Sequence, residues 1–263
     1  MDLGLNGRVA LVGGSSAGLG RAIAARLAAE GARVAVNGRD AAKAERAAAL
    51  IASETGGEAV PFPADLSDPG QVGTLVAAVA ARFGRLDILI CNAGGPPPTT
   101  FADATPDAWR RALDLSLMST VHLCRTAVPL MEERGWGRIV CMTSFAARQP
   151  MPNLILSTTA RAGVLGFAKC LADEVAPHGI LVTTVCPGWF RTERVTELAA
   201  ARAARQGTTA EAVLGAQVAT IPVGRMGEPE ELASVVAFLA SERGSYITGA
   251  VLAVDGGYLR SID

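Results

Sequence analysis

Short apolar segments alternate with longer amphipathic segments from one end of the chain to the other. The short segments have the length and composition of buried strands, and they occupy 8–12, 33–36, 59–62, 86–90, 138–142, 180–185 and 251–254. Between them, apolar residues recur at helical spacing after Gly18 and at 40–53, 72–83, 106–133 and 154–175. Strands that alternate with crossover helices form a parallel sheet with helices on both faces. We therefore predict an α/β fold with a doubly wound, seven-stranded parallel sheet.

Residues 193–221 depart from this alternation. They are rich in Ala, Arg and Thr, and their pattern is helical. They follow the carboxyl end of the sixth predicted strand, where doubly wound folds bind their ligands. Because no linker, repeat or low-complexity segment divides the chain, we predict one domain over 1–263 with a small helical substrate lid at about 193–221.

A glycine-rich loop joins the first strand to the first helix, with the spacing Gly14-x-x-x-Gly18-x-Gly20. Glycines at such a turn let the backbone approach a pyrophosphate, and the following helix directs its N-terminal amides at the phosphates. A loop placed between a strand and a helix in this way is typical of a Rossmann-type dinucleotide-binding domain. The loop residues predicted to contact the dinucleotide are Gly14, Ser15, Ser16, Gly18, Leu19 and Gly20.

Four further motifs follow the glycine loop in a fixed order. They are Cys91-Asn92-Ala93-Gly94 after the fourth strand, Cys186-Pro187-Gly188-Trp189-Phe190-Arg191-Thr192 after the sixth, 221–231, and 246–257. Together with the loop, they resemble the short-chain dehydrogenase/reductase family over about residues 7–258. Within that family, the motifs most resemble those of the 3-oxoacyl-carrier-protein reductases. The resemblance implies an oxidoreductase that binds a nicotinamide dinucleotide.

The resemblance also implies positions around that dinucleotide. Asp65 and Leu66 would meet the adenine. Residues on the adenosine side would be Asn92, Ala93 and Gly94. Residues that position the nicotinamide would be Pro187, Gly188 and Thr192.

The end of the second strand predicts which dinucleotide is preferred. The strand runs into Asn37-Gly38-Arg39-Asp40. An acidic residue at this end favours the free ribose hydroxyl of NAD, whereas a guanidinium such as that of Arg39 suits the 2′-phosphate of NADP. The alternative is that Asp40 caps the next helix and Arg39 is solvated, and Ala17 leaves the loop without a second basic residue. We predict NADP(H) as the preferred cofactor, with NAD(H) as the alternative.

The family reduces carbonyls with an Asn, a Ser, a Tyr and a Lys, and this chain matches only the Ser. Ser144 follows the fifth strand at the corresponding position. Where the family has Y-x-x-x-K, the chain reads Ser157-Thr158-Thr159-Ala160-Arg161, and Ser116 stands in place of the Asn. Ser157 and Arg161 share a helix face at i and i+4. We predict that these three serines and Arg161 form the catalytic group, with Arg161 also on the cofactor ribose.

These replacements change the available chemistry. A phenol titrates near ~10 and can be drawn toward neutrality, whereas a serine hydroxyl is not readily ionised and Arg161 stays protonated. The chain has two tyrosines, Tyr246 and Tyr258, and neither is expected near this site within the same subunit. The proton donor of an ordinary reduction is therefore missing from the predicted group. If another group supplies the proton, the first candidate is Tyr258 from the tail of a neighbouring subunit.

Three functions remain open. The first is an NADP(H)-dependent oxidoreductase acting on a carbonyl and secondary-alcohol pair, with Ser144 and Ser157 on the oxygen. The second is a non-redox enzyme, a lyase or dehydratase, in which these serines and Arg161 bind an anionic small molecule. Nearby arginines that would suit a carboxylate or phosphate substrate are Arg148, Arg191 and Arg194. The third is a catalytically silent nucleotide-binding protein with a regulatory role. The family resemblance favours the first.

Charge and composition narrow the partners. The 24 Lys and Arg balance the 25 Asp and Glu at a net charge of −1. No long run of one sign is present, which argues against nucleic acid or an anionic membrane as the main partner. We expect a cytoplasmic protein, because the sequence shows no export signal and no apolar window long enough for a membrane span. The resemblance implies a homotetramer or homodimer with its main interface at 106–133 and 153–176 and another at the C-terminal tail.

The cysteines are five in number and none has a metal-binding spacing such as C-x-x-C. Their odd number and apolar setting predict reduced core residues and no metal site. They are Cys91, Cys124, Cys141, Cys170 and Cys186.

Overall fold

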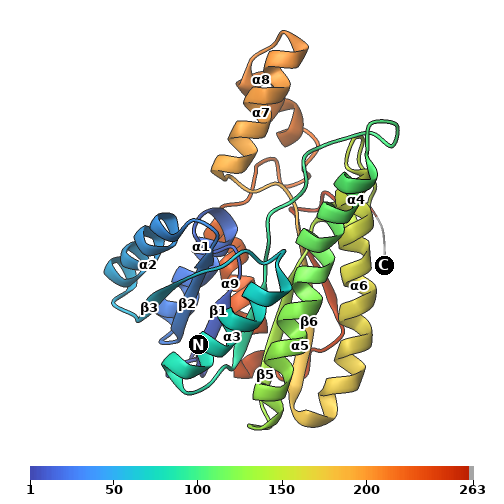
Figure 1. Cartoon of the computed structure of the whole chain (residues 1–263). Helices are drawn as coiled ribbons and strands as arrows, with labels where there is room; N and C mark the ends of the chain where they lie inside the picture. The colour runs from blue at the N-terminus through green and yellow to red at the C-terminus, as the bar shows by residue number, and fades with distance from the viewer. Residues whose placement is uncertain (261–263) are drawn as a thin grey trace.

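The sheet has seven strands, all parallel, in the order β3-β2-β1-β4-β5-β6-β7 (Figure 1). This computed structural model describes residues 1–260, so the last three residues of the predicted domain lie outside it. The strands are β1 (Val9–Val12), β2 (Arg33–Gly38), β3 (Ala59–Pro63), β4 (Ile88–Cys91), β5 (Gly137–Met142), β6 (Ile180–Pro187) and β7 (Val251–Val254). The predicted doubly wound α/β fold is confirmed.

Helices cover both faces of the sheet (Figure 1). One face is covered by α1 (Gly18–Ala29), α2 (Ala41–Thr55) and α9 (Pro229–Leu239), whose buried apolar residues join one core cluster with β1 and β2. The other is covered by α3 (Pro69–Phe83), α5 (Ser119–Glu132) and α6 (Ile155–Val175), which form the second cluster. The two apolar layers explain why the strands between them are mostly apolar, with Asn37, Arg138, Thr183 and Thr184 as buried polar exceptions.

The region predicted as one helix over 106–133 has an interruption. It consists of α4 (Pro106–Leu113), a π-helical segment at Asp114–Met118, and α5. The chain stays helical throughout, but the wider turn changes which side chains face inward. Ser116 lies within this wider turn.

Helix α9 was not predicted. Pro229 occupies its first turn, and Glu228 and Glu231 form a capping box there, a recognised start signal. The remaining short elements are 3-10 turns at Phe145–Ala147, Ala176–His178 and Glu242–Gly244.

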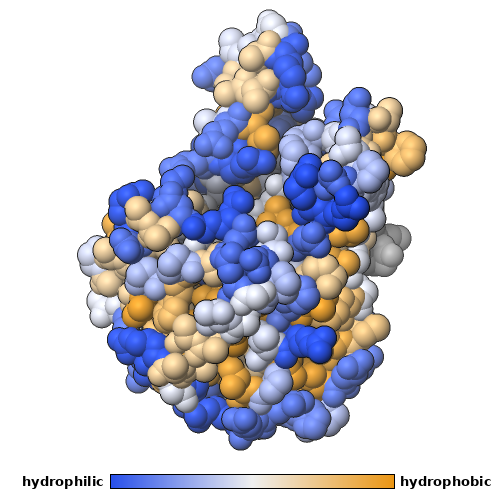
Figure 2. All heavy atoms as spheres, viewed as in Figure 1, coloured by the Kyte–Doolittle hydropathy of each residue, from blue (hydrophilic) through white to orange (hydrophobic). Residues whose placement is uncertain are grey.

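The 193–221 segment forms two helices, α7 (Glu193–Gln206) and α8 (Ala210–Val218). Thr192 and Thr209 cap their N-termini, and Gly207 at φ 63° makes the turn between them. The α7–α8 hairpin projects beyond the body of the molecule, with a hollow at its base (Figures 1 and 2). Its helical character is as expected, whereas its role as a lid stays a prediction.

The prediction that all cysteines are core residues is wrong for one of them. Cys170 is exposed, whereas the other four are buried. The inward face of α6 is formed by Val164, Ala168 and Ala172, and Cys170 lies on the opposite face of the same helix. Within residues 1–260 no cluster of His, Cys, Asp or Glu could hold a metal ion, and no helix there is long and apolar enough to cross a membrane.

Candidate active site

The predicted site residues follow the carboxyl ends of neighbouring strands. The strand order reverses between β1 and β4, and a crevice at such a point is where doubly wound sheets bind ligands. The glycine loop follows β1, Asn92 follows β4 and Ser144 follows β5. The sheet topology therefore brings these residues to one edge.

The glycine loop is held close to the turn after β4. The Asn92 side chain donates from Nδ2 to the backbone oxygens of Gly13 and Gly14 at 2.9 and 3.3 Å. A Cβ on Gly20 would lie 2.3 Å from the Gly14 oxygen, and Gly14 and Gly18 have φ of +52° and +55°. Only glycine fits these positions without displacing backbone.

Helix α1 begins without a side-chain cap. Its N-cap residue is Ala17, whereas Asp40 and Asp68 accept hydrogen bonds from the first turns of α2 and α3. The first N–H groups of α1 therefore have no side-chain acceptor and lie beside a loop of small residues. This is the arrangement that accepts a phosphate, so the residues fit the pyrophosphate of a dinucleotide.

Ser15 and Asn37 stabilise the loop from below. The Ser15 hydroxyl donates to the Val12 oxygen at 2.6 Å and accepts from the Asn37 N–H at 2.9 Å. Asn37 Oδ1 accepts from the Gly14 N–H at 3.1 Å. The Ser15 N–H also donates to the Asn37 oxygen, at 2.7 Å, and the residue is fully buried, so Ser15 supports the loop from inside the protein. Sequence reasoning missed Asn37, whose signal was a polar residue at the end of a buried strand.

Two roles were considered for the end of β2, and Arg39 and Asp40 each fit one of them. Asp40 caps α2 by accepting from the Lys43 N–H at 3.0 Å, as the alternative proposed. Arg39 is exposed and makes no ion pair or hydrogen bond with any residue from 1 to 260. Its guanidinium is therefore free to meet a ligand at the carboxyl end of β2.

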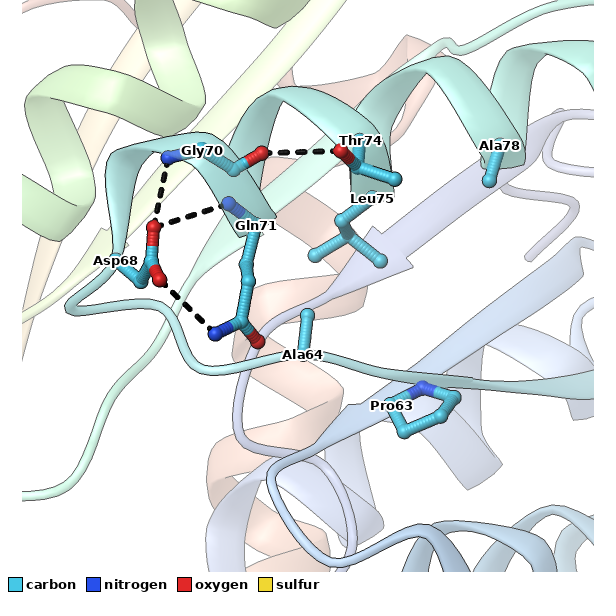
Figure 3. Close-up of a pocket in the computed structure, with 8 residues that line it drawn as sticks. All are labelled: Pro63, Ala64, Asp68, Gly70, Gln71, Thr74, Leu75 and Ala78. Atoms are coloured by element: carbon cyan, nitrogen blue, oxygen red, sulfur yellow. Dashed lines mark hydrogen bonds between the residues drawn. The ribbon is translucent and has the colours of Figure 1, made fainter.

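The turn after β3 contains Asp65 and Leu66. Asp65 Oδ1 accepts from the Ser67 N–H and hydroxyl at 2.9 and 2.7 Å, and Leu66 is buried against the glycine loop. Beyond this turn, a shallow hollow lies between the end of β3 and the first turns of α3 (Figure 3). Asp68 and Gln71 bond each other and the helix start there, so their polar atoms serve to cap α3.

Arg161 occupies the centre of the predicted catalytic group. Its Nη1 donates to the Thr143 oxygen at 2.7 Å, and its Nη2 donates to the Gly94 oxygen at 3.2 Å. Its Nε donates to Ser157 Oγ at 3.3 Å. The guanidinium thus ties α6 to the turns after β4 and β5. Burial lowers the pKa of Arg161 from its ordinary value.

Both flanking serines keep a hydrogen to donate. Ser157 accepts from Arg161, so its own hydroxyl hydrogen is left for another acceptor. Ser144 caps the 3-10 turn by accepting from the Ala146 N–H at 3.1 Å, so its hydroxyl hydrogen is also left for another acceptor. A substrate oxygen reaching both hydroxyls would accept two hydrogen bonds.

Ser116 is buried in the π-helical segment at 7% exposure. Its hydroxyl has no hydrogen-bond partner among the described residues. The segment packs against α6, where the Leu117 side chain contacts the Gly163 backbone position. Ser116 is therefore an unsatisfied polar group beside the site, in contact with neither Ser144 nor Ser157 through any hydrogen bond.

The segment after β6 is fixed by the C-terminal strand. A Cβ on Gly188 would lie 2.6 Å from the Asp255 Cα, so the two chains are in close contact. Pro187 ends β6, and Thr192 is committed to capping α7. Arg191, one of the arginines considered for an anionic substrate, pairs with Glu228 at 2.8 Å.

Tyr258 corrects the expectation that neither tyrosine lies near the site. Its ring packs 4.9 Å from that of Phe145, the residue after Ser144, and 6.4 Å from that of Trp189, the residue after Gly188. The phenol is 9% exposed. The sequence held only one indirect signal, an aromatic residue directly after the motif Asp255-Gly256-Gly257.

Comparisons with known proteins agree with this geometry. A family model described as enoyl-(acyl carrier protein) reductase matches residues 14–259. D-beta-hydroxybutyrate dehydrogenase of Cupriavidus necator is 35% identical, over 97% of this chain and 99% of that protein. The chain belongs to the short-chain dehydrogenase/reductase family. The 3-oxoacyl-[acyl-carrier-protein] reductase of Synechocystis is 36% identical, over 96% of this chain and 97% of that one.

A solved member of the family has nearly the same backbone. L-sorbose reductase from Gluconobacter frateurii, complexed with NADPH and L-sorbose, superposes with a TM-score of 0.96 at 33% identity, and each chain is covered completely. The predictions of an oxidoreductase of this family and of a 3-oxoacyl-reductase-like sequence are confirmed. The roles of the individual site residues stay predictions.

Proposed function

We propose that the protein is an NADP(H)-dependent oxidoreductase that interconverts a small-molecule carbonyl compound and its secondary alcohol. The observation that carries this proposal is the convergence at one sheet edge of an uncapped helix N-terminus and two hydroxyl donors, Ser144 and Ser157. The relatives support the reaction class, since their names describe hydroxybutyrate, 3-oxoacyl and sorbose chemistry.

Arg39 supports the preference for NADP(H) over NAD(H). It is exposed at the end of β2 with its guanidinium unengaged by residues 1–260, and a guanidinium binds a 2′-phosphate bidentately. The sorbose reductase structure contains NADPH. When bound, the cofactor supplies or accepts a hydride. The glycine loop, Asn92-Ala93-Gly94 and Pro187-Gly188 would hold it, with Asp65 and Leu66 near the adenine.

The substrate oxygen would lie between Ser144 and Ser157. Each hydroxyl donates one hydrogen bond to it, which stabilises negative charge as the carbonyl is reduced. Arg161 fixes Ser157 and the two backbone turns, so we assign it a positioning role. Its guanidinium donates to four acceptors within the protein, which argues against the lyase alternative, where it would bind an anion.

The α7–α8 hairpin is proposed to cover the bound substrate. A hollow of about 580 Å³ at its base is lined by 191–193, Thr196, Glu197 and Ala200. Arg194 is exposed on the same first turn of α7 and would favour an anionic substrate. A dimer or tetramer with α5 and α6 at its interface is proposed from the family alone.

The test is turnover of acetoacetate, ethyl acetoacetate and L-sorbose with NADPH and with NADH. We expect NADPH oxidation with at least one compound, at a higher kcat/KM than with NADH. Binding of NADPH without turnover of any compound would favour the silent nucleotide-binding alternative. Failure to bind either dinucleotide would overturn the proposal.

A further inference from the structure

Three aromatic side chains form a cluster at the base of the α7–α8 hairpin. Phe145, Trp189 and Tyr258 pack with centroid separations of 4.9 to 6.4 Å, and Ile221 and Met226 complete the buried part of the cluster. These aromatics come from the turn after β5, the turn after β6 and the C-terminal segment after β7. The cluster therefore joins Ser144, the segment predicted to hold nicotinamide, and the hairpin.

The phenol in this cluster has an unusually weak partner. Among residues 1–260, the only hydrogen-bond partner of the Tyr258 hydroxyl is the Met151 thioether, at 3.4 Å, and a thioether is a poor hydrogen-bond acceptor. Most buried phenol hydroxyls bond a stronger acceptor. The donor strength of this hydroxyl is thus largely unused and available to a ligand.

A second polar atom in the same cluster has no partner at all. Trp189 Nε1 is buried without any hydrogen bond within residues 1–260. Its ring lies edge-on to Tyr258 at 84°. The Tyr258 hydroxyl thus has a weak acceptor and the indole N–H of the adjacent ring has none, and an oxygen-bearing ligand at the phenol would supply the acceptor that the Tyr258 hydroxyl lacks.

Tyr258 is held in place from both sides. The Leu259 N–H donates to Asp255 Oδ2 at 2.8 Å, and the Arg260 N–H donates to Gln149 Oε1 at 3.4 Å. The opposing loop is fixed in turn, because Asn153 adopts φ 63° and its oxygen accepts from the Thr99 N–H at 2.8 Å. The phenol therefore has a defined position relative to the turn that contains Ser144.

We propose that Tyr258 is the phenol of this active site, and that its hydroxyl donates a hydrogen bond and then its proton to the substrate oxygen. The inference rests on the proposed carbonyl reduction. The carbonyl carbon accepts a hydride from the reduced nicotinamide, and the C=O π pair moves to oxygen. The O–H bond of Tyr258 breaks as the new alcohol O–H forms, and the phenolate then regains a proton from water. Rotation about the C–O bond turns the hydroxyl hydrogen away from Met151 and toward the substrate oxygen.

The two tyrosines provide a matched pair of variants. Tyr258→Phe removes one hydroxyl and keeps the packed ring, whereas Tyr246→Phe makes the same change at a fully exposed position. We expect Tyr258→Phe to lower kcat/KM by about 10²-fold or more, the usual contribution of a general acid. Tyr246→Phe should retain native kcat/KM, and both variants should retain native NADPH affinity. A Tyr258→Phe value within twofold of native would overturn the proposal.

A second measurement does not depend on turnover. In the Tyr246→Phe variant Tyr258 is the only tyrosine, so a carbon-13 label on the tyrosine ring gives one resonance to follow. We expect it to shift when acetoacetate, its ethyl ester or L-sorbose saturates the protein with NADP⁺, a combination that does not react. A shift without native turnover would keep Tyr258 in the binding site and overturn only the proposed reaction. An unchanged resonance with a compound that the native enzyme reduces, or with all three compounds, would overturn the role of Tyr258.

Discussion

The polar groups at the two edges of the parallel sheet differ in how fully they are hydrogen-bonded. At the amino edge, where β1, β4 and β5 begin, Asp87 is fully buried and accepts from Arg85 at 2.5 and 2.7 Å and from the Val9 N–H at 2.8 Å. Arg8 and Arg138 stack on the ring of Trp136 at 3.7 and 4.3 Å. Among the described residues of this edge, the buried polar atoms without a hydrogen-bond partner are the Trp136 N–H and Arg26 Nε, in the last turn of α1.

At the carboxyl edge, buried polar atoms lacking partners are numerous. The side chains concerned are Ser116, Thr158, Trp189 and Gln217. Each edge also contains a buried arginine whose pKa is lowered by burial, Arg138 at one and Arg161 at the other. Buried polar groups that are hydrogen-bonded stabilise a fold, whereas buried polar groups without a partner indicate where a ligand can bond. The polar groups at the amino edge therefore stabilise the fold. Several polar groups at the carboxyl edge have no partner, which lowers stability but leaves them available for binding.

The largest effect is expected at the amino edge. Asp87→Ala leaves Arg85 and the Val9 N–H without their acceptor and removes one of the two ion-pair partners of Arg8, and we expect the free energy of unfolding to fall by about 3 kcal/mol. Denaturant unfolding measures it. The control is Asp107→Ala, which breaks an exposed pair with Arg110 and should cost less than about 1 kcal/mol. Equal losses in the two variants would contradict the role given to this edge.

Two serines cap 3-10 turns at opposite edges of the sheet, and we expect the loss of one hydroxyl to affect activity and the loss of the other to affect stability. Ser144→Ala should lower kcat/KM by about 10²-fold through loss of a donor to the substrate oxygen, with little change in stability. Ser241→Ala removes a buried hydroxyl that bonds Phe238 and Arg243, so it should lower stability by about 1 kcal/mol and leave kcat/KM unchanged. Steady-state kinetics and thermal unfolding of both variants test this, and a reversed pattern would reject the comparison.

The two arginines at the ends of β2 test cofactor choice. Arg39→Ala should weaken NADPH binding about tenfold or more and leave NADH binding unchanged, because it removes a charge-assisted contact to the 2′-phosphate. Arg33→Ala, at the amino end of the same strand, should leave both affinities unchanged. Fluorescence titration of both dinucleotides decides the matter, and an unaltered NADPH affinity in Arg39→Ala would remove its assigned role.

A gain in stability is expected where a hydroxyl has no partner. Ser116→Ala replaces a buried, unpartnered hydroxyl with a methyl group, and we expect the free energy of unfolding to rise by about 0.5–1 kcal/mol. Ser119 lies one turn on and donates to the Leu115 oxygen at 2.6 Å, so Ser119→Ala should instead lose about 1 kcal/mol. Changes of the same sign in both variants would show that Ser116 has a partner in solution.

The smallest effect concerns an exposed pair at the carboxyl edge. Arg225 lowers the pKa of Glu231 from an ordinary 4.5 to about 2. A lowered pKa stabilises the fold above about pH 4.5, and this contribution is lost as the pH falls toward 2. Glu231→Gln should therefore flatten the decline of Tm between these pH values. Glu230→Gln, in the same helical turn, is the control, and an identical slope in the two variants would argue against the pair.

The sequence contained most of the fold, because strands buried between two helical layers are mostly apolar along their length. Val34 to Val36 and Ile139 to Cys141 are examples of the short apolar runs that identify such strands. The π-helical turn at Ser116 escaped notice, since apolar spacing does not encode the pitch of one turn. Helix α9 did leave signals, the Glu228 and Glu231 box and a buried face with Leu232 and Val236, but they were interpreted only as a family motif.

The site was less predictable than the fold. The motif positions placed Ser144, Ser157 and Arg161 in one region. Ser157 and Arg161 lie on α6, which packs beside the end of β5, and Ser144 follows that strand. The contact of Tyr258 with Phe145 depends on how the C-terminal segment crosses the turn after β5. No local pattern encodes such a contact between distant parts of the chain. The role of Asn37 beneath the glycine loop was missed for the same reason.

The hydrogen bonds of Arg161 also constrain how such a site can evolve. Replacing Arg161 by Lys alone would leave carbonyls at Gly94 or Thr143 without a donor, since one ammonium does not span the fork of a guanidinium. Replacing Ser157 by Tyr alone would remove the acceptor of Arg161 Nε. The two positions are therefore epistatic, and their effects in a double-mutant cycle should not add. A change from this Ser/Arg pair to a Tyr/Lys pair would therefore pass through a single variant that lacks at least one of these hydrogen bonds.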